Sequence, residues 1–288
     1  MRTRERLPII FPMRPPIVFA HANGFPAGTY RVLFEAWRAA GWRVLALPMF
    51  GHDPKRPPKS NWPHQRDELI DFIEHEGAAP AYLVGHSMGG YLSLLAASKR
   101  PGLARGIVLL DSPVVGGLLA HGVRVFKATG WGKRFSPGRI STKRREHWPG
   151  ADLGDVHAHF AAKPAFARWA PGVLDDYVAS GTRPDAAGTG RVLAFERDIE
   201  TALYETLPHH LVPLLRRHPV GCPVAFIGGR QSTEVRQVGM VATRRITRGR
   251  IQWIDGSHLF PFERPHATAA CVLARLKAFE AAASASDG

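Results

Sequence analysis

One serine in the sequence stands in a setting that can activate its hydroxyl. Residues 85–90 read Gly-His-Ser-Met-Gly-Gly, so Ser87 is the central residue of a G-x-S-x-G pattern. An apolar run of strand type, residues 81–84, precedes the pattern, and a helix-length stretch ending at Arg100 follows it. A strand-to-helix elbow of this kind exposes the hydroxyl and presents helix N-terminal N–H groups to developing negative charge. The pattern therefore predicts a nucleophilic Ser87; an inert glycine-rich turn is the alternative.

A serine hydroxyl needs a base that takes its proton, and the base needs a third group that holds its tautomer. His258 is the candidate base, because it lies in the loop between the last predicted strand and the C-terminal helix. A histidine in that loop can reach over the sheet edge to Ser87. The chain has 14 histidines, so a histidine alone is weak evidence. The prediction for His258 depends on its position after the last predicted strand.

Two carboxylates compete for the role of the third group. Asp111 follows the apolar run 106–110, and the carboxyl end of a parallel strand lies on the active-site side of a sheet. It also keeps the chain order serine, acid, histidine. Glu234 follows the next strand, in a turn that holds no Asp, and could instead be a first-turn helix carboxylate. We favour Asp111 and expect Ser232 to hydrogen-bond to the Asp111–His258 pair.

Acyl chemistry at Ser87 would also require two backbone N–H groups aimed at the oxygen of a tetrahedral intermediate. Met88, the residue after the nucleophile, is expected to supply one. The second should come from residues 21–28, which follow the first predicted strand and are rich in small residues. We favour the N–H of Asn23 over that of Phe25. The alternative is an ordinary Gly/Pro turn without a catalytic role.

Six apolar runs rich in Val, Ile and Leu predict the strands that must position these residues. Continuous apolar strands that alternate with helices are typical of a parallel sheet covered on both faces. We therefore expect an α/β fold with a mostly parallel central sheet flanked by helices. The predicted strands are 16–20, 42–47, 81–84, 106–110, 223–227 and 250–254, and the predicted helices are 29–40, 61–76, 90–100 and 265–283.

The alternation breaks between residues 113 and 220, where no strong strand pattern occurs. A structureless loop of that length is uncommon, so we expect a helical cap inserted after the sixth strand, counting a weak early pair around residues 9–11. The core would then comprise residues 1–112 and 221–288. Aromatic side chains of this stretch would line an apolar acyl pocket or form the core of the cap itself; they are Phe126, Trp131, Phe135, Trp148, Phe160, Phe166 and Trp169.

The chain is strongly basic, with 38 Lys and Arg against 24 Asp and Glu and a formal net charge of +14. The basic residues are mostly scattered arginines, apart from the cluster 143–145, and no nucleic-acid motif accompanies them. We therefore expect no specific nucleic-acid binding. The charge would form a solvated surface, or a rim that attracts anionic substrates such as carboxylates or coenzyme A thioesters.

The hydropathy and the cysteines of the chain argue against a membrane-spanning, a secreted or a disulfide-rich protein. No apolar run reaches the length of a membrane span, and the short apolar patch after the basic N-terminus does not suit a signal peptide. The cysteines, Cys222 and Cys271, form no metal-binding spacing and no disulfide framework. We expect a cytoplasmic protein without a metal or organic cofactor. The sequence leaves the oligomeric state open, including a homo-oligomer.

Together these residues resemble the α/β-hydrolase superfamily over nearly the whole chain. Residues 21–28 match its oxyanion loop, 85–90 its elbow and 256–265 its histidine loop. The sequence departs from the superfamily pattern in one place, since no Asp follows the strand 223–227. The pair of Asp111 and Ser232 looks like the arrangement of some cap-bearing esterases. A serine at position 87 argues against the subclasses that use an Asp nucleophile, the haloalkane dehalogenases and epoxide hydrolases.

The resemblance implies hydrolysis of a small-molecule carboxylic ester through an acyl-enzyme. A thioester or a carbon–carbon bond is an alternative substrate for the same three side chains. A protein that keeps the fold and only binds a ligand is a third possibility. The sequence does not specify the acyl length or the alcohol.

Overall fold

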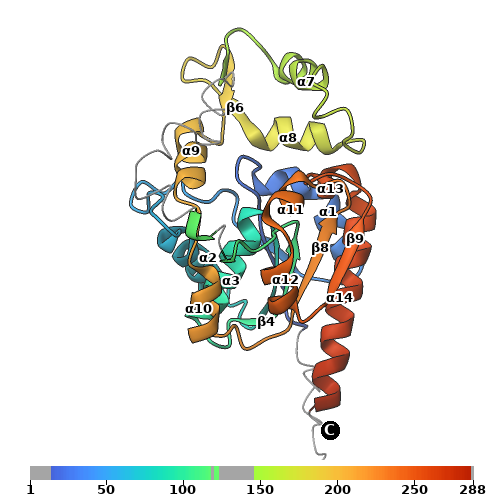
Figure 1. Cartoon of the computed structure of the whole chain (residues 1–288). Coiled ribbons are helices and arrows are strands. Elements are labelled where there is room, and N and C mark those ends of the chain that lie inside the picture. Colours follow the sequence, from blue (N-terminus) through green and yellow to red (C-terminus); the bar gives the residue numbers. More distant parts are fainter. Residues whose placement is uncertain (1–13, 118–119, 123–145, 287–288) are drawn as a thin grey trace, which may run out of the picture.

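Parallel strands form the central sheet of the protein. The computed structural model describes residues 14–117, 120–122 and 146–286 (Figure 1). Within these residues six strands pair in the order β2-β1-β3-β4-β8-β9, and every pair is parallel, as the sequence predicts. The strand expected around residues 9–11 lies outside the described residues. The strands are β1 (Ile17–Ala20), β2 (Val44–Ala46), β3 (Ala81–His86), β4 (Ala104–Leu110), β8 (Val224–Gly229) and β9 (Ile251–Ile254).

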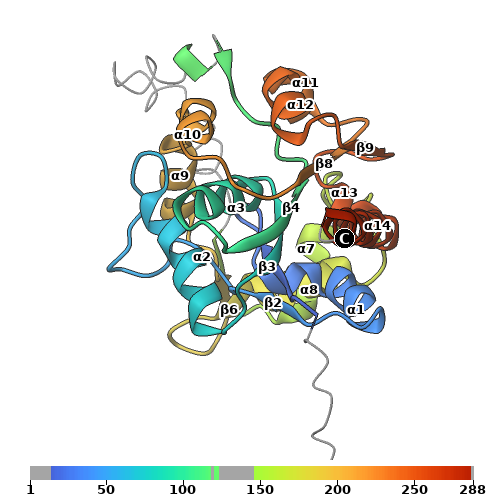
Figure 2. The same ribbon diagram turned by 90° about the horizontal axis from the view of Figure 1, so that it is seen from below.

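Helices cover both faces of this sheet. Alternate strand residues point to opposite faces, so Ile17 and Phe19 pack in one hydrophobic cluster while Val18 and Ala20 pack in the other. The view in Figure 2 shows α1 and α14 on one side and α2 and α3 on the other. These helices are α1 (Arg31–Ala39), α2 (Pro63–His75), α3 (Met88–Lys99) and α14 (Pro265–Ser286), all close to their predicted bounds.

Short helices surround the sheet edges, and among them the sequence indicated the one that holds Glu234 in its first turn. The 3-10 helix η1 leads into α1, α11 and α12 connect β8 to β9, and α13 precedes α14. Their few turns give no clear hydrophobic periodicity. They are η1 (Ala27–Tyr30), α11 (Thr233–Val238), α12 (Val241–Thr247) and α13 (Phe260–Glu263).

The segment between β4 and β8 holds helices and a small antiparallel sheet of order β5-β7-β6. The sequence did not predict this sheet, because strands of two or three residues are too short to show alternation. Phe126, Trp131, Phe135 and the basic cluster 143–145 lie outside the described residues. The elements are β5 (His147–Trp148), α7 (Leu153–Ala161), α8 (Val173–Gly181), β6 (Thr182–Pro184), β7 (Arg191–Leu193), α9 (Arg197–Glu205) and α10 (Leu211–Arg217).

Part of this segment lies over the edge of the sheet where the strands end. In Figure 1, α7 and α8 lie at the same end of the molecule as α11 and α13. Arg31 of α1 forms an ion pair with Asp176 of α8 at 2.6 Å, and the Ala170 N–H donates to the Phe262 carbonyl at 2.9 Å. By contrast α10 contacts α3, and the Ser98 hydroxyl donates to the carbonyl of His218 just after α10. Of the helices in the described part of the chain, none is both long and apolar enough to cross a bilayer.

Two glycines allow the turn between β3 and α3 to pack against its neighbours. A Cβ on Gly89 would lie 1.9 Å from the carbonyl oxygen of Ala20, and one on Gly85 would lie 2.3 Å from the backbone of Gly89. Backbone atoms of the sheet cannot move aside as a flexible side chain can. Glycine at both positions is therefore a requirement of the packing.

We predict that Gly89→Ala destabilises the protein strongly. Overpacking in a rigid core costs about 1–3 kcal/mol, and this contact involves backbone. The free energy of unfolding in urea should fall by about 2 kcal/mol or more. The control is Gly122→Ala, where none of the described residues beyond its own helix and chain neighbours comes within 4 Å of the added Cβ. Equal stability of the two variants would show that the elbow packing is looser than described.

Candidate active site

Ser87 lies at the N-terminus of α3 in a conformation that few non-glycine residues adopt. Its φ is +51° and its ψ is −111°. Hydrogen bonds hold this strained backbone in place: the Ser87 N–H donates to the Leu110 carbonyl at 2.9 Å, and the Ser112 hydroxyl donates to the Ser87 carbonyl at 2.5 Å. Strain that the surroundings maintain is common at functional sites. The end of β4 thus fixes the position of the predicted nucleophile.

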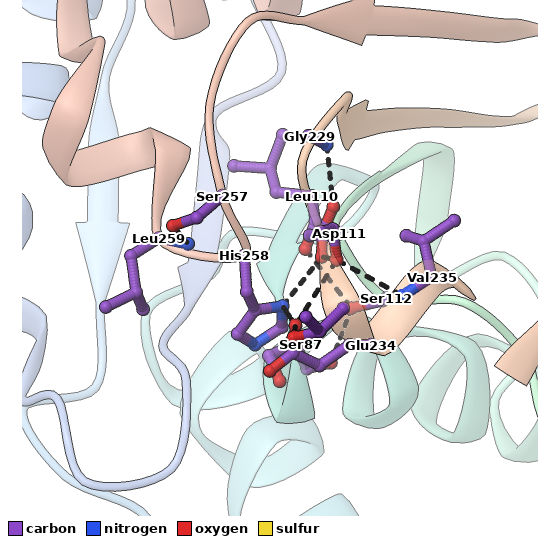
Figure 3. A network of polar contacts seen from close by, with 12 residues as sticks. Ser87, Leu110, Asp111, Ser112, Gly229, Glu234, Val235, Ser257, His258 and Leu259 are labelled. Atoms are coloured by element: carbon purple, nitrogen blue, oxygen red, sulfur yellow. Dashed lines mark hydrogen bonds and ion pairs between the residues drawn. The ribbon is translucent and has the colours of Figure 1, made fainter. Parts of the chain in front are cut away.

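The structure brings His258 and Asp111 into contact. Figure 3 shows both residues with Ser87 in one network of polar contacts. The Nδ1 of His258 lies 2.7 Å from Oδ2 of Asp111, a hydrogen-bond distance. A carboxylate can only accept, so Nδ1 carries the proton and Nε2 of a neutral ring is free to act as a base.

Asp111 is fully buried, and three donors compensate for the loss of water around its charge. The Gly229 N–H donates to Oδ1 at 2.7 Å, while the Ser232 hydroxyl, at 2.5 Å, and His258 donate to Oδ2. The backbone of Asp111 has a φ of +42°, in the left-handed region that Asp tolerates better than most residues. The carboxylate is therefore held by β8, by the turn after β8 and by the histidine loop.

Glu234, the alternative acid, lies nearby but does not hydrogen-bond to the imidazole. Its Oε2 is 3.8 Å from Nδ1 of His258, and its side chain is 43% exposed. The Ser232 hydroxyl has one proton, and the 2.5 Å contact with Asp111 is much shorter than its 3.3 Å contact with Glu234. Ser232 also accepts from the Val235 N–H at the start of α11. Ser232 thus joins the Asp111–His258 pair to α11, and Glu234 acts on His258 only through its charge.

The environment of His258 raises its pKa above the ordinary 6.5. Burial alone would lower the pKa, because it disfavours the charged imidazolium. The hydrogen bond and the negative charge of Asp111, with a smaller effect of the Glu234 charge, outweigh burial. His258 is consequently a stronger base than an isolated histidine.

The two expected oxyanion donors form no backbone hydrogen bond within the described part of the chain. The N–H groups of Asn23 and Met88 donate no hydrogen bond to any residue that the structure describes. The N–H of Phe25, the other candidate, donates to the Ala22 carbonyl at 3.1 Å within its own turn. Asn23 and Met88 therefore remain available to bind an anionic oxygen, and Phe25 does not.

A neutral histidine fixes the direction of the Asn23 N–H. His21 accepts from the Phe50 N–H at Nε2, at 3.0 Å, and its Nδ1 lies 2.9 Å from the Ala22 carbonyl. Nδ1 must then be the protonated nitrogen, and burial lowers the pKa of His21 to about 4. Because the Ala22–Asn23 peptide is planar and trans, anchoring the Ala22 carbonyl turns the Asn23 N–H to the opposite side.

A second buried histidine, for which the sequence suggests no role, connects the oxyanion loop with the histidine loop. The Nε2 of His86 lies 3.0 Å from the His258 carbonyl, and its Nδ1 lies 2.7 Å from the Tyr30 hydroxyl. A carbonyl only accepts, so Nε2 is protonated, Nδ1 accepts from Tyr30, and Tyr30 accepts from the Ala22 N–H at 3.2 Å. Burial lowers the pKa of His86, which keeps it neutral.

The sequence offers one indication of this network, which is the position of His86 inside the G-x-S-x-G pattern. The residue ends β3, and every residue of that strand is buried. A buried histidine requires partners for both ring nitrogens. Sequence alone does not identify Tyr30 and the His258 carbonyl as those partners, because they come from distant segments.

Aromatic rings join the segment between β4 and β8 to the two loops of the site. Phe25 of the oxyanion loop contacts Trp169 and Tyr177, with ring centroids 6.1 Å and 5.7 Å apart. Trp169 also contacts Phe262 of α13 at 4.7 Å. Trp148, Phe160 and Trp169 are buried, which favours the packing role for these three aromatic side chains over the lining of an acyl pocket.

Asp111, Glu234 and His258 are the described residues whose donor atoms gather closely enough to suggest a metal site, within 4.8 Å of one another. The 2.7 Å hydrogen bond between His258 and Asp111 occupies the same atoms that a metal ion would need. The donor set is therefore better explained by the hydrogen bond. Cys222 and Cys271 are free thiols.

The Alpha/beta hydrolase family matches residues 17–271, and the chain belongs to that family. Among solved structures, an E-2-(acetamidomethylene)succinate hydrolase superposes with a TM-score of 0.65 at 22% identity, covering 90% of both chains. A thioesterase domain from the curacin biosynthetic pathway superposes with a TM-score of 0.64 at 17% identity, covering 91% of both chains. At these identities the likeness shows the fold.

Curated relatives match over shorter regions. The sn-1-specific diacylglycerol lipase ABHD11 of Mus musculus is 32% identical over 104 residues, 35% of this chain and 34% of the relative. The monoglyceride lipase of Rattus norvegicus is 28% identical over 106 residues, 34% of this chain and 35% of the relative. The chain thus matches about a third of the length of these relatives.

We predict that Tyr30→Phe impairs catalysis as well as stability. The change leaves the Ala22 N–H and His86 Nδ1 without their shared partner, and each unpaired buried group costs about 1–3 kcal/mol. Turnover of an activated ester should fall about tenfold, because the loops on both sides of Ser87 lose a common anchor.

Tyr91→Phe is the matched control for that prediction. The Tyr91 hydroxyl is also buried, and it bridges the Pro113 carbonyl and the Val115 N–H at 2.8 Å and 2.9 Å. It should lower thermal stability similarly and leave turnover near that of the unmodified protein. Unchanged turnover in Tyr30→Phe would show that the network serves folding alone.

Proposed function

We propose that this protein is a serine hydrolase that cleaves carboxylic esters of small molecules through an acyl-enzyme. The observation that carries the proposal is the His258–Asp111 hydrogen bond of 2.7 Å at the sheet edge that bears Ser87. The strained Ser87 backbone and the unused N–H groups of Asn23 and Met88 support it.

In the proposed reaction the Ser87 hydroxyl attacks the acyl carbon and its proton passes to Nε2 of His258. The carbonyl oxygen becomes an oxyanion that accepts from the N–H groups of Asn23 and Met88. His258 then gives its proton to the departing alkoxide, which leaves as the alcohol. Water attacks the acyl-enzyme by the same route and releases the carboxylic acid and Ser87. Asp111 stabilises the imidazolium in both halves of the reaction.

The same groups can cleave a thioester, and the structural neighbour from curacin biosynthesis is a thioesterase domain. We favour esters because the curated relatives named above are acylglycerol lipases. A panel of ester and thioester substrates of increasing acyl length separates these reactions. A protein that only binds its ligand would show no burst of product with an activated ester.

We further propose a cap that limits access to Ser87. It is shorter than the expected 113–220 and comprises residues 146–206, because α10 packs against α3 instead. Support comes from its contacts with both loops of the site. Phe25 and Asn23 of the oxyanion loop contact it through aromatic rings and through the hydrogen bond from Asn23 Nδ2 to the Glu200 carbonyl at 3.0 Å. Phe262, which follows His258, contacts Trp169 at a ring distance of 4.7 Å. The cytoplasmic location, the lack of a cofactor and the lack of specific nucleic-acid binding stay predictions.

We predict that Ser87→Ala abolishes hydrolysis of an activated ester such as p-nitrophenyl acetate. Loss of the nucleophile should lower turnover by a factor of about 10³ or more while the fold stays intact. Ser98→Ala, at the far end of α3, is the control and should stay active. Substantial activity in folded Ser87→Ala protein would contradict the proposed nucleophile.

The pH dependence of turnover should separate the two carboxylates. His258 accepts a proton only when neutral, so activity should fall as the pH drops through its raised pKa, with a midpoint above 6.5. Glu234→Gln removes a charge that raises this pKa and should move the midpoint to lower pH with little loss of the maximum rate. Asp111→Asn should lower the maximum rate itself by about 10³–10⁴, because it favours the wrong tautomer.

Ser232→Ala should lower the maximum rate by an amount between those of Glu234→Gln and Asp111→Asn, since Asp111 keeps two of its three hydrogen-bond donors. Circular dichroism of each variant is the folding control. If turnover is lost in Glu234→Gln and nearly normal in Asp111→Asn, then Glu234 and not Asp111 is the acid.

A further inference from the structure

A large cavity lies at the edge of the sheet opposite Ser87. It is lined by residues at the starts of strands, including Tyr82, Arg105 and Val224, and its volume is about 1080 Å³. Figure 2 views the molecule from this side and shows α10, α12 and α14 around the starts of β4 and β8. Ser87 follows the end of β3, so this cavity is separate from the candidate active site.

The walls of the cavity are largely aliphatic. Side chains of α10, α12 and the strands contribute, and Phe279 of α14 adds an aromatic ring. Val241, on the rim at the start of α12, is 81% exposed, which is unusual for a large apolar side chain. The aliphatic lining residues include Val114, Val212, Leu215, Val220, Val224, Val238, Ala242 and Ile246.

Five arginines also line the cavity, and none of the described lining residues is acidic. Among the residues the structure describes, no carboxylate lies within ion-pair distance of any of the five, although many other arginines of the chain form such pairs. Guanidinium groups around one hollow create a positive potential that attracts an anion. They are Arg105, Arg216, Arg245, Arg248 and Arg250.

We propose that this cavity binds a dissolved long-chain carboxylate, with the alkyl chain along the aliphatic wall and the carboxylate among the arginines. Arginine suits this role because its planar fork matches a carboxylate with two parallel hydrogen bonds. The volume is just above the usual range for small-molecule sites, so the cavity has room for a long alkyl chain. A bilayer surface needs several protruding apolar side chains, and among the described lining residues Val241 is the one with a strongly exposed large apolar side chain. The proposal does not depend on the proposed hydrolase activity.

Isothermal titration calorimetry with laurate, below its micelle concentration, tests the proposal. Dodecyltrimethylammonium has a similar chain with the opposite charge and is the ligand control. Laurate should bind the unmodified protein at least about tenfold more tightly than this cation, because the arginines repel it.

A matched pair of double variants tests the place of binding. Arg216→Glu with Arg245→Glu reverses two charges that line the cavity, whereas Arg217→Glu with Arg244→Glu reverses their sequence neighbours, which do not line it. The net charge changes equally in the two proteins. The first pair should weaken laurate binding at least about tenfold, and the second pair less than about twofold.

A third variant, Ala242→Phe, fills the cavity without changing charge and should also weaken binding. It keeps the test valid if the charge reversals prevent folding. Three results would overturn the proposal: no laurate binding, equal binding of the two amphiphiles, or equal effects of the two double variants. Binding to anionic phospholipid vesicles without binding of dissolved laurate would also overturn it, in favour of a membrane surface.

Discussion

The buried charge of Asp111 is the constraint on which the rest of the site depends. A carboxylate without access to water is tolerable only where donors surround it. Its donors come from β8, from the turn before α11 and from the loop after β9, so those segments must converge at the end of β4. The same requirement places the His258 ring and fixes its tautomer. The geometry of the candidate base is thus a consequence of solvating one buried anion.

Two neutral buried histidines extend the hydrogen-bond network beyond Asp111 and His258. His21 anchors the Ala22 carbonyl, and His86 links the Ala22 N–H, through Tyr30, to the backbone of His258. Each imidazole donates at one nitrogen and accepts at the other. The donor and acceptor of every hydrogen bond in this network are therefore determined. Burial keeps both rings neutral. Two loops far apart in sequence are therefore held by one continuous set of hydrogen bonds.

The sequence predicted the central sheet and the helices beside it, because long apolar strands and amphipathic helices carry strong periodic signals. It also indicated Ser87, Asp111 and His258, since each lies within four residues of the end of a predicted strand. The helices α11, α12 and α13 and the sheet of β5, β6 and β7 are too short to show a period. The choice between Asp111 and Glu234 depends on a difference between 2.7 Å and 3.8 Å, which tertiary packing determines and local sequence does not.

One residue, Asn23, is both a proposed oxyanion donor and a contact of the proposed cap. The backbone N–H of Asn23 faces away from the anchored Ala22 carbonyl, while its side-chain Nδ2 donates to the Glu200 carbonyl of α9. Its Oδ1 is buried without a partner among the described residues. A displacement of α9 would therefore pull on the loop that carries the N–H. In the proposed mechanism, a single asparagine thus connects substrate fit under the proposed cap with stabilisation of the oxyanion.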